Sequence, residues 1–194
     1  MRAQAQTVAV DGARRRGAGR VAIALLAALP ALLGVGRARA ELLEVRQIAG
    51  GMECPECARG LRLLIKEIPG VAAAETSWNR RVLTVRFQRG NRATLAQVRA
   101  AVVRQHFEAR EAELLIAGRL TIDAGGRHWL WVSGSEQTYG IDLRGRSADW
   151  QRAVGELSGA EVLVTGRVPG GARAEDPLIL FPVSIERART RPFQ

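Results

Sequence analysis

The feature that most constrains the fold is the order in which the hydrophobic pattern changes along residues 43–115. Strand-like runs and runs with the helical spacing of apolar residues follow each other as β-α-β-β-α-β. The runs, in chain order, are Leu43–Ile48, Leu61–Ile68, Val71–Ser77, Val82–Phe87, Thr94–Val103 and Ala109–Leu115. This split βαβ order predicts a ferredoxin-like βαββαβ sandwich over residues 41–115.

The two helical runs carry recognisable stop and start signals. Pro69-Gly70 ends the first run directly after Ile68. Thr94 is placed to cap the second run, in which one face is expected to be shared by Leu95, Val98, Val102 and Val103. Between the helices, a turn at Asn79 joins two strand-like runs, which predicts a hairpin.

Residues past 115 follow a different pattern. One helical run, Ala148–Leu157, lies between the third and fourth of five strand-like runs. The five runs are Leu115–Ile122, His128–Ser133, Thr138–Leu143, Glu161–Val168 and Leu178–Ile185. This layout predicts a small OB-like β-barrel over residues 116–190, and hence an α+β chain of two domains. Residues 109–122 are nearly continuous strand-like sequence, so we expect little linker between the domains.

The first 40 residues have the parts of an export signal in the required order. Arginines at 14–16 and 20 precede a 15-residue apolar stretch, 21–35, and Ala38-Arg39-Ala40 supplies a small-x-small cleavage site. The stretch is shorter than the roughly 20 residues that a bilayer-spanning helix needs. We therefore expect residues 1–40 to be a signal peptide and the mature chain to be periplasmic, with an uncleaved inner-membrane anchor as the alternative.

The formal net charge of +10 is concentrated in that leader. Residues 1–40 hold seven arginines and one aspartate, whereas the rest of the chain holds 22 basic and 18 acidic side chains. The arginines past residue 115 are scattered among acids, so we expect no nucleic-acid partner. Trp129 and Trp131 share one face of a strand, and we expect them to fill the barrel, with a binding surface as the alternative.

The two cysteines of the chain, Cys54 and Cys57, exclude a disulfide scaffold with several bridges. They lie in the sequence Gly-Met-Glu-Cys-Pro-Glu-Cys at 51–57, between the first strand and the first helix. Two thiolates at a helix N-terminus suit Cu(I), Hg(II), Zn(II) or Cd(II) far better than magnesium or calcium. A structural zinc site has four ligands, so two on a loop indicate a site that transfers its ion.

A glycine and a methionine precede the cysteine pair as Gly51-Met52-x-Cys54-x-x-Cys57, and Ile-Pro-Gly-Val follows the helix at 68–71. With the βαββαβ order, these motifs make residues 41–115 similar to the heavy-metal-associated (HMA) domains of copper chaperones, metal-transporting ATPases and periplasmic mercury-binding proteins. The resemblance implies that Cys54 and Cys57 bind the metal, Cu(I) first, with Hg(II) or Zn(II) as alternatives. It also implies that Met52 packs beneath the loop and, with Gly51, shapes it.

The resemblance also directs attention to Gln105-His106-Phe107, where family members often have Gly-Tyr or Gly-Phe. It makes His106 a candidate third metal ligand, with a solvated loop histidine as the alternative. Phe107 is expected to cap the core behind the cysteines and so to help shape the loop. The other histidine, His128, is expected on a strand surface.

We therefore expect an exported, non-catalytic protein that binds a soft metal ion through Cys54 and Cys57. Its partner would be a metal transporter or a metalloenzyme-assembly protein, and two chains could share one ion as a metal-bridged homodimer. Membrane contact is expected only if the leader stays uncleaved. Two alternatives remain: a scaffold that binds through the OB-like domain with its cysteines oxidised, and a thiol-disulfide oxidoreductase.

Overall fold

The computed structural model describes residues 41–171 and 178–188, and the predicted signal peptide lies outside them. The elements are β1 (Glu41–Gly50), α1 (Pro55–Lys66), β2 (Val71–Ser77), β3 (Val82–Phe87), α2 (Leu95–Arg104), β4 (Glu108–Ile122), β5 (His128–Val132), β6 (Gln137–Ile141), α3 (Ala148–Gly155), β7 (Glu161–Val168) and β8 (Leu178–Arg187). The expected β-α-β-β-α-β order is therefore present up to β4. Within the described ranges, no helix is long and apolar enough to cross a membrane.

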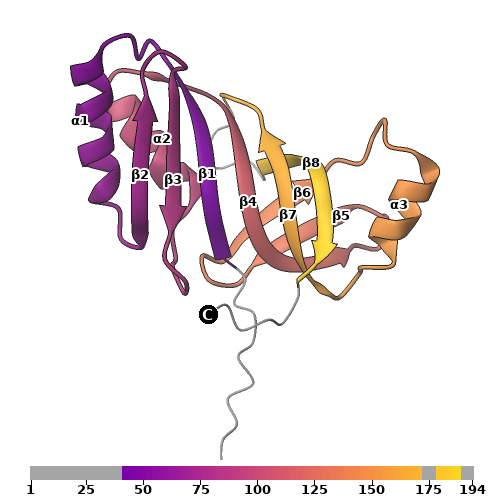
Figure 1. The fold of residues 1–194 in the computed structure, drawn as a ribbon. Helices are drawn as coiled ribbons and strands as arrows, with labels where there is room; N and C mark the ends of the chain where they lie inside the picture. Colours follow the sequence, from indigo (N-terminus) through magenta and orange to yellow (C-terminus); the bar gives the residue numbers. More distant parts are fainter. Residues whose placement is uncertain (1–40, 172–177, 189–194) are drawn as a thin grey trace, which may run out of the picture. The chain divides into compact units, whose positions relative to one another are not determined.

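The strands form a continuous sheet in the order β2-β3-β1-β4-β5-β6-β8-β7, and β4 also pairs with β7 (Figure 1). Neighbouring strands are antiparallel except β6 and β8, which are parallel. Because β4 pairs with β7 as well as with β5, the last five strands close into a barrel. The structure is thus a mixed α/β fold with a five-stranded barrel, and α3 connects the third and fourth barrel strands as expected.

Helices α1 and α2 contact each other and pack against β1, β2 and β4. The apolar residues at helical spacing point into this layer: Leu61, Ile65 and Val98 are fully buried, as are Val45 and Leu83 on the strands. Such a match between sequence period and buried face is what amphipathic helices and half-buried strands require. The expectation for one residue of α2 was wrong, because Val103 is 59% exposed and lies off the buried face.

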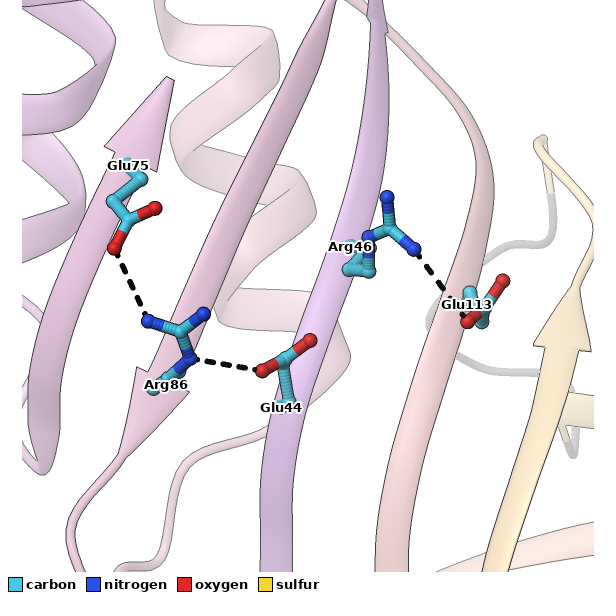
Figure 2. A network of polar contacts seen from close by, with 5 residues as sticks. All are labelled: Glu44, Arg46, Glu75, Arg86 and Glu113. Atoms are coloured by element: carbon cyan, nitrogen blue, oxygen red, sulfur yellow. Dashed lines mark hydrogen bonds and ion pairs between the residues drawn. The ribbon is translucent and has the colours of Figure 1, made fainter. Parts of the chain in front are cut away.

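Charged side chains occupy the other positions of the same strands (Figure 2). Arg86 on β3 lies between Glu75 on β2 and Glu44 on β1, with nitrogen–oxygen distances of 3.1 and 3.0 Å. Arg46 on β1 faces Glu113 on β4 at 3.9 Å. The two carboxylates raise the pKa of the Arg86 guanidinium above its ordinary value, chiefly because Arg86 Nε donates a hydrogen bond to Glu44. This face of the sheet is therefore an exposed, charge-paired surface.

The barrel has its own apolar interior. Leu120, Leu130, Val164 and Leu180 are fully buried, and Tyr139 is 1% exposed. Burial raises the pKa of the Tyr139 phenol well above its ordinary value, and its hydroxyl donates a hydrogen bond to Gln137 at 2.8 Å. Aliphatic side chains from alternate strand positions therefore fill the barrel, as expected for a small barrel.

The tryptophans of β5 do not fill the barrel, so that expectation was wrong. Leu130 and Val132 point inward, which puts Trp129 and Trp131 on the outer face because side chains alternate along a strand. Trp131 is 44% exposed. The Trp129 indole N–H donates a hydrogen bond to Asp123 at 3.0 Å. This bond is the main cause that lowers the pKa of Asp123 to about 2.

Strand β4 belongs to both parts of the sheet. It pairs with β1 along residues 108–117, with β7 along 112–119 and with β5 along 119–122. The nearly continuous strand expected from the sequence is therefore one strand of 15 residues. The division into domains at 115/116 stays a prediction.

A buried arginine reinforces this connection. Arg99 of α2 is 9% exposed and donates hydrogen bonds to the carbonyl oxygens of Pro169 at 2.7 Å and Val168 at 3.3 Å, and to Gln47 at 3.4 Å. Burial lowers the pKa of its guanidinium, and Nη1 is buried without a hydrogen-bond partner among the described residues. Arg99 thus connects α2 to the end of β7 through hydrogen bonds, and these acceptors are neutral groups.

Candidate metal site

The cysteine loop is positioned by the end of β1 and the start of α1. Gly51, directly after β1, has φ +87°, a left-handed conformation that glycine adopts without a steric penalty. Cys54 is the N-cap of α1, and Pro55 occupies the first turn, where its missing N–H removes no helical hydrogen bond. The sequence therefore turns the chain sharply at Gly51 and begins the helix with a cysteine.

The two cysteine sulfurs meet at this helix terminus. Cys54 and Cys57 form a disulfide with their Cα atoms 5.2 Å apart, and both residues are half-buried. The backbone N–H of Cys57 donates a hydrogen bond to the Cys54 sulfur at 3.0 Å. In the dithiol form, this N–H and the positive end of the helix dipole would favour a thiolate on Cys54.

Met52 and Phe107 lie beside the loop as structural residues. Met52 is fully buried within the core, so its thioether faces away from solvent. Phe107 is half-buried against the same core, and its Cδ1 lies 3.9 Å from where a Cβ on Gly51 would be. Met52 is therefore a core residue next to the cysteines, and Phe107 packs against the same core near Gly51. The loop-shaping role of Gly51, Met52 and Phe107 stays a prediction.

His106 ends helix α2 in a left-handed conformation, with φ 60°. Its N–H donates to the carbonyl of Val103 at 2.8 Å, and the N–H of Phe107 donates to the carbonyl of Val102 at 3.2 Å. These two bonds form a Schellman cap, in which the left-handed position is usually glycine. His106 thus adopts the backbone conformation that glycine would favour at this place, and its imidazole is exposed.

No group of three or more histidine, cysteine or acidic side chains in residues 41–171 and 178–188 is arranged to hold a metal ion. The donor set that the structure brings together is the cysteine pair. The third-ligand role of His106 stays a prediction.

Two ion pairs flank the cysteines, and the sequence pattern did not reveal them. Glu53 pairs with Arg81 at 3.0 Å, and Glu56 pairs with Arg59 at 3.1 Å; all four side chains are at least half exposed. Arg59 follows Glu56 at the i,i+3 spacing of helical ion pairs, which could have signalled that contact. Arg81 lies in the β2–β3 turn, and its carbonyl accepts the N–H of Ala49 at 2.9 Å. Both carboxylates beside the sulfurs therefore have a nearby cation.

The second histidine also differs from expectation. His128 begins β5 but is only half exposed, and its Nε2 is buried without a hydrogen-bond partner among the described residues. The expectation of a surface-strand histidine was therefore wrong in part. Pairing with Ile122 and Ile141 on the neighbouring strands places it inside the sheet.

Comparisons with known proteins give three structural neighbours. No protein-family model matches the chain, and no curated protein matches it. The CopZ metallochaperone is 18% identical in sequence, and the match covers 34% of this chain and 97% of that protein. The yeast copper transporter domain Ccc2a is 20% identical, and the match covers 34% of this chain and 89% of that domain. A Bacillus anthracis protein described as copper-ion-binding is 20% identical, and the match covers 38% of this chain and 99% of that protein. Each has a TM-score of 0.32. These neighbours are described as a metallochaperone, a copper transporter domain and a copper-ion-binding protein, and each match covers 34–38% of this chain.

Proposed function

We propose that this protein carries a soft metal ion, Cu(I) first, on the thiolates of Cys54 and Cys57. The observation that carries the proposal is the placement of both sulfurs at the N-cap and first turn of α1, half-exposed and beside a backbone N–H donor. Two thiolates suit soft ions, and Hg(II) or Zn(II) would compete for the same pair. A two-ligand site near the surface leaves room for a partner's ligands, so the ion can move by ligand exchange.

Loading requires the dithiol form of the protein. An external dithiol would break the S–S bond, supply two electrons and two protons to the pair, and itself become a disulfide. The thiols lose their protons when the ion binds, so affinity falls as pH falls. The Cys57 N–H and the α1 dipole stabilise the negative sulfur of Cys54, while Arg81 and Arg59 offset the charge of the neighbouring carboxylates.

We propose the wider assignment together with this site. Residues 41–115 would be a ferredoxin-like member of the HMA family, and residues 116–190 an OB-like domain. The protein would be periplasmic after removal of residues 1–40, non-catalytic, and would deliver its ion to a membrane transporter or a metalloenzyme under assembly. Two chains could share one ion through four thiolates.

A competition titration tests the carrier proposal. The reduced chain is titrated with Cu(I) against bicinchoninate, with Hg(II) and Zn(II) in parallel, and compared with a Cys54→Ser, Cys57→Ser chain. We expect one Cu(I) per chain, or one per two chains, withdrawn from the chelator by the reduced wild type and not by the serine chain. Equal binding by the serine variant would overturn the proposal. A Met52→Leu chain serves as control, because the thioether is buried and should contribute no ligand.

The disulfide favours a second candidate, a scaffold with permanently oxidised cysteines. Alkylation of thiols in intact cells before lysis separates the two: a carrier should show a population of reduced Cys54 and Cys57, whereas a scaffold should show none. A thiol-disulfide oxidoreductase would instead accelerate insulin reduction, and this activity would disappear in the serine variant.

A further inference from the structure

The outer face of the barrel carries apolar side chains that neither the core nor the cysteine site uses. Trp131, Ile179, Phe181 and Val183 are 44, 39, 41 and 51% exposed. Residues 179, 181 and 183 alternate along β8 and therefore project from one face, as Trp129 and Trp131 do on β5. We call Trp129, Trp131, Ile179, Phe181 and Val183 the barrel apolar surface.

Strand β6 lies between β5 and β8 and makes this surface continuous. Gly140 of β6 is paired with Trp129 on one side and with Ile179 on the other. A Cβ at Gly140 would lie 2.9 Å from the Ile179 Cδ1 and 3.5 Å from the Trp129 Cζ3. The two side chains therefore meet over the glycine, and the apolar face runs unbroken across three strands. Contiguous exposed apolar surface of this kind commonly marks an interaction site.

A hollow of about 500 Å³ adjoins the apolar surface. Ile179 lines both, and the polar part of the wall comes from Arg127, His128, Asp142, Arg144 and Gln151. The volume lies within the range of small-ligand and side-chain pockets, roughly 300–1,000 Å³. The hollow is therefore large enough to receive a side chain from a segment that lies along the apolar surface.

The charges at the hollow are arranged with the cations outward. The side chains of Arg127 and Arg144 are 74 and 88% exposed, whereas their partners Asp123 and Asp142 are 28 and 7% exposed. Arg127 Nε donates to Asp123 at 2.8 Å, and its guanidinium lies 5.5 Å from the centre of the Trp129 ring. Arg144 donates from Nε and Nη2 to Asp142. The carboxylates hold both guanidinium groups in place while positive charge faces the solvent.

We propose that the barrel binds an extended acidic segment of a partner protein, with an apolar side chain on the barrel apolar surface and a carboxylate between Arg127 and Arg144. Fixed guanidinium groups recognise carboxylates through charge-assisted hydrogen bonds. Tryptophan and arginine are also the side chains that most often dominate binding energy at protein interfaces. The site lies apart from the cysteines and does not depend on metal binding.

Peptide selection on the immobilised full chain tests this proposal. Random dodecapeptides are displayed on phage, and the synthetic form of the most enriched sequence is titrated by tryptophan fluorescence and calorimetry. We expect enrichment of an aromatic or branched apolar residue within four positions of an aspartate or glutamate. Substitution Arg127→Ala with Arg144→Ala should weaken binding at least tenfold, and Trp131→Ala at least threefold.

Matched variants distinguish binding at this site from nonspecific electrostatic or hydrophobic binding elsewhere on the surface. Trp78→Ala removes an indole that is 46% exposed in the β2–β3 turn, and Arg46→Ala with Arg110→Ala removes two ion-paired arginines outside the hollow. Both controls should change affinity less than twofold. The Cys54→Ser, Cys57→Ser chain should bind the peptide as the wild type does, so this test can fail independently of the metal proposal.

Three results of the peptide experiment would overturn the proposal. They are no enrichment above the blank support, enrichment of basic or uncharged peptides, and equal binding by the Arg127→Ala, Arg144→Ala chain. Vesicles of phosphatidylcholine with phosphatidylglycerol are the last arm. If they bind the chain lacking residues 1–40 and lose this binding on Trp131→Ala, the surface faces a membrane and the peptide assignment is wrong.

Discussion

Replacing His106 with glycine should stabilise the protein, even though histidine was a candidate ligand. His106 closes α2 with φ 60°, and its side chain is exposed, so the substitution removes little packing. A left-handed backbone strains an L-residue by roughly 1–2 kcal/mol. Glycine relieves that strain but loses about 0.5–1 kcal/mol through the greater freedom of the unfolded chain.

The two terms leave His106→Gly more stable than the wild type by about 0.5 kcal/mol. The matched variant His106→Ala keeps the left-handed strain and loses the tolerance that histidine has for this region, so it should be less stable than the wild type. The glycine and alanine variants should then differ by roughly 1 kcal/mol in the free energy of unfolding.

Urea unfolding of the oxidised chain, followed by far-ultraviolet circular dichroism, measures this order. With a slope of about 1–3 kcal/mol per molar urea, the two midpoints should differ by a few tenths of a molar to about 1 M. An alanine variant at least as stable as the glycine variant would refute the capping account. The same two chains, reduced, also test the ligand role: a third ligand requires weaker Cu(I) binding in both, whereas a cap alone changes neither.

Three further predictions test other parts of the structure. Met52→Ala should lower the free energy of unfolding by about 2–5 kcal/mol, because a fully buried side chain leaves a cavity beneath the cysteine loop; urea unfolding measures it. Arg99→Ala should destabilise by about 1–3 kcal/mol, because the carbonyls of Val168 and Pro169 lose their donor, while Arg99→Met, which keeps the volume, should lose less; a smaller loss for alanine than for methionine would contradict this. Asp123 has its pKa lowered to about 2, so its contribution is present above the ordinary value near 3.8 and is lost as pH falls through 2. The tryptophan fluorescence of the wild type, to which Trp129 contributes, should report this loss, and Asp123→Asn should remove that pH dependence.

The sequence pattern predicted most of the helices and strands, because caps, turns and the spacing of apolar residues depend on residues close together in the chain. Strands β2 and β3 have the expected bounds. Thr94 caps α2 as expected: its hydroxyl accepts a hydrogen bond from the N–H of Gln97, and Gln97 Oε1 accepts one from the N–H of Thr94. The pairing of β4 with β7 could not be read in this way, because it joins residues about 50 positions apart. Pattern also placed tryptophans in the barrel, where Leu130 and its aliphatic neighbours fill the interior instead.

At the candidate site, the motif predicted which residues meet, but not their electrostatic surroundings. Cys54 and Cys57 meet because they are close in sequence at the start of α1. The places expected for Met52 and Phe107 came from the family resemblance, since Phe107 lies between α2 and β4 and not in the cysteine loop. Arg81 reaches Glu53 only because the β2–β3 turn lies beside the end of β1, which is a tertiary contact. Arg99 was missed because a buried arginine is rare, and its acceptors lie some 70 residues further along the chain.

Strand β4 sets the separation between the cysteine loop and the barrel hollow. At its start, Glu108 pairs with Gly50 next to the loop, and at its end, Ile122 pairs with His128 at the hollow. The path between them is roughly 45 Å along the strand, less in a straight line because β4 curves (Figure 1). A partner that engaged both ends would gain effective concentration only if its own two contact points had the matching spacing. A flexible linker would allow many distances between the cysteine loop and the hollow, whereas the continuous strand β4 fixes one distance.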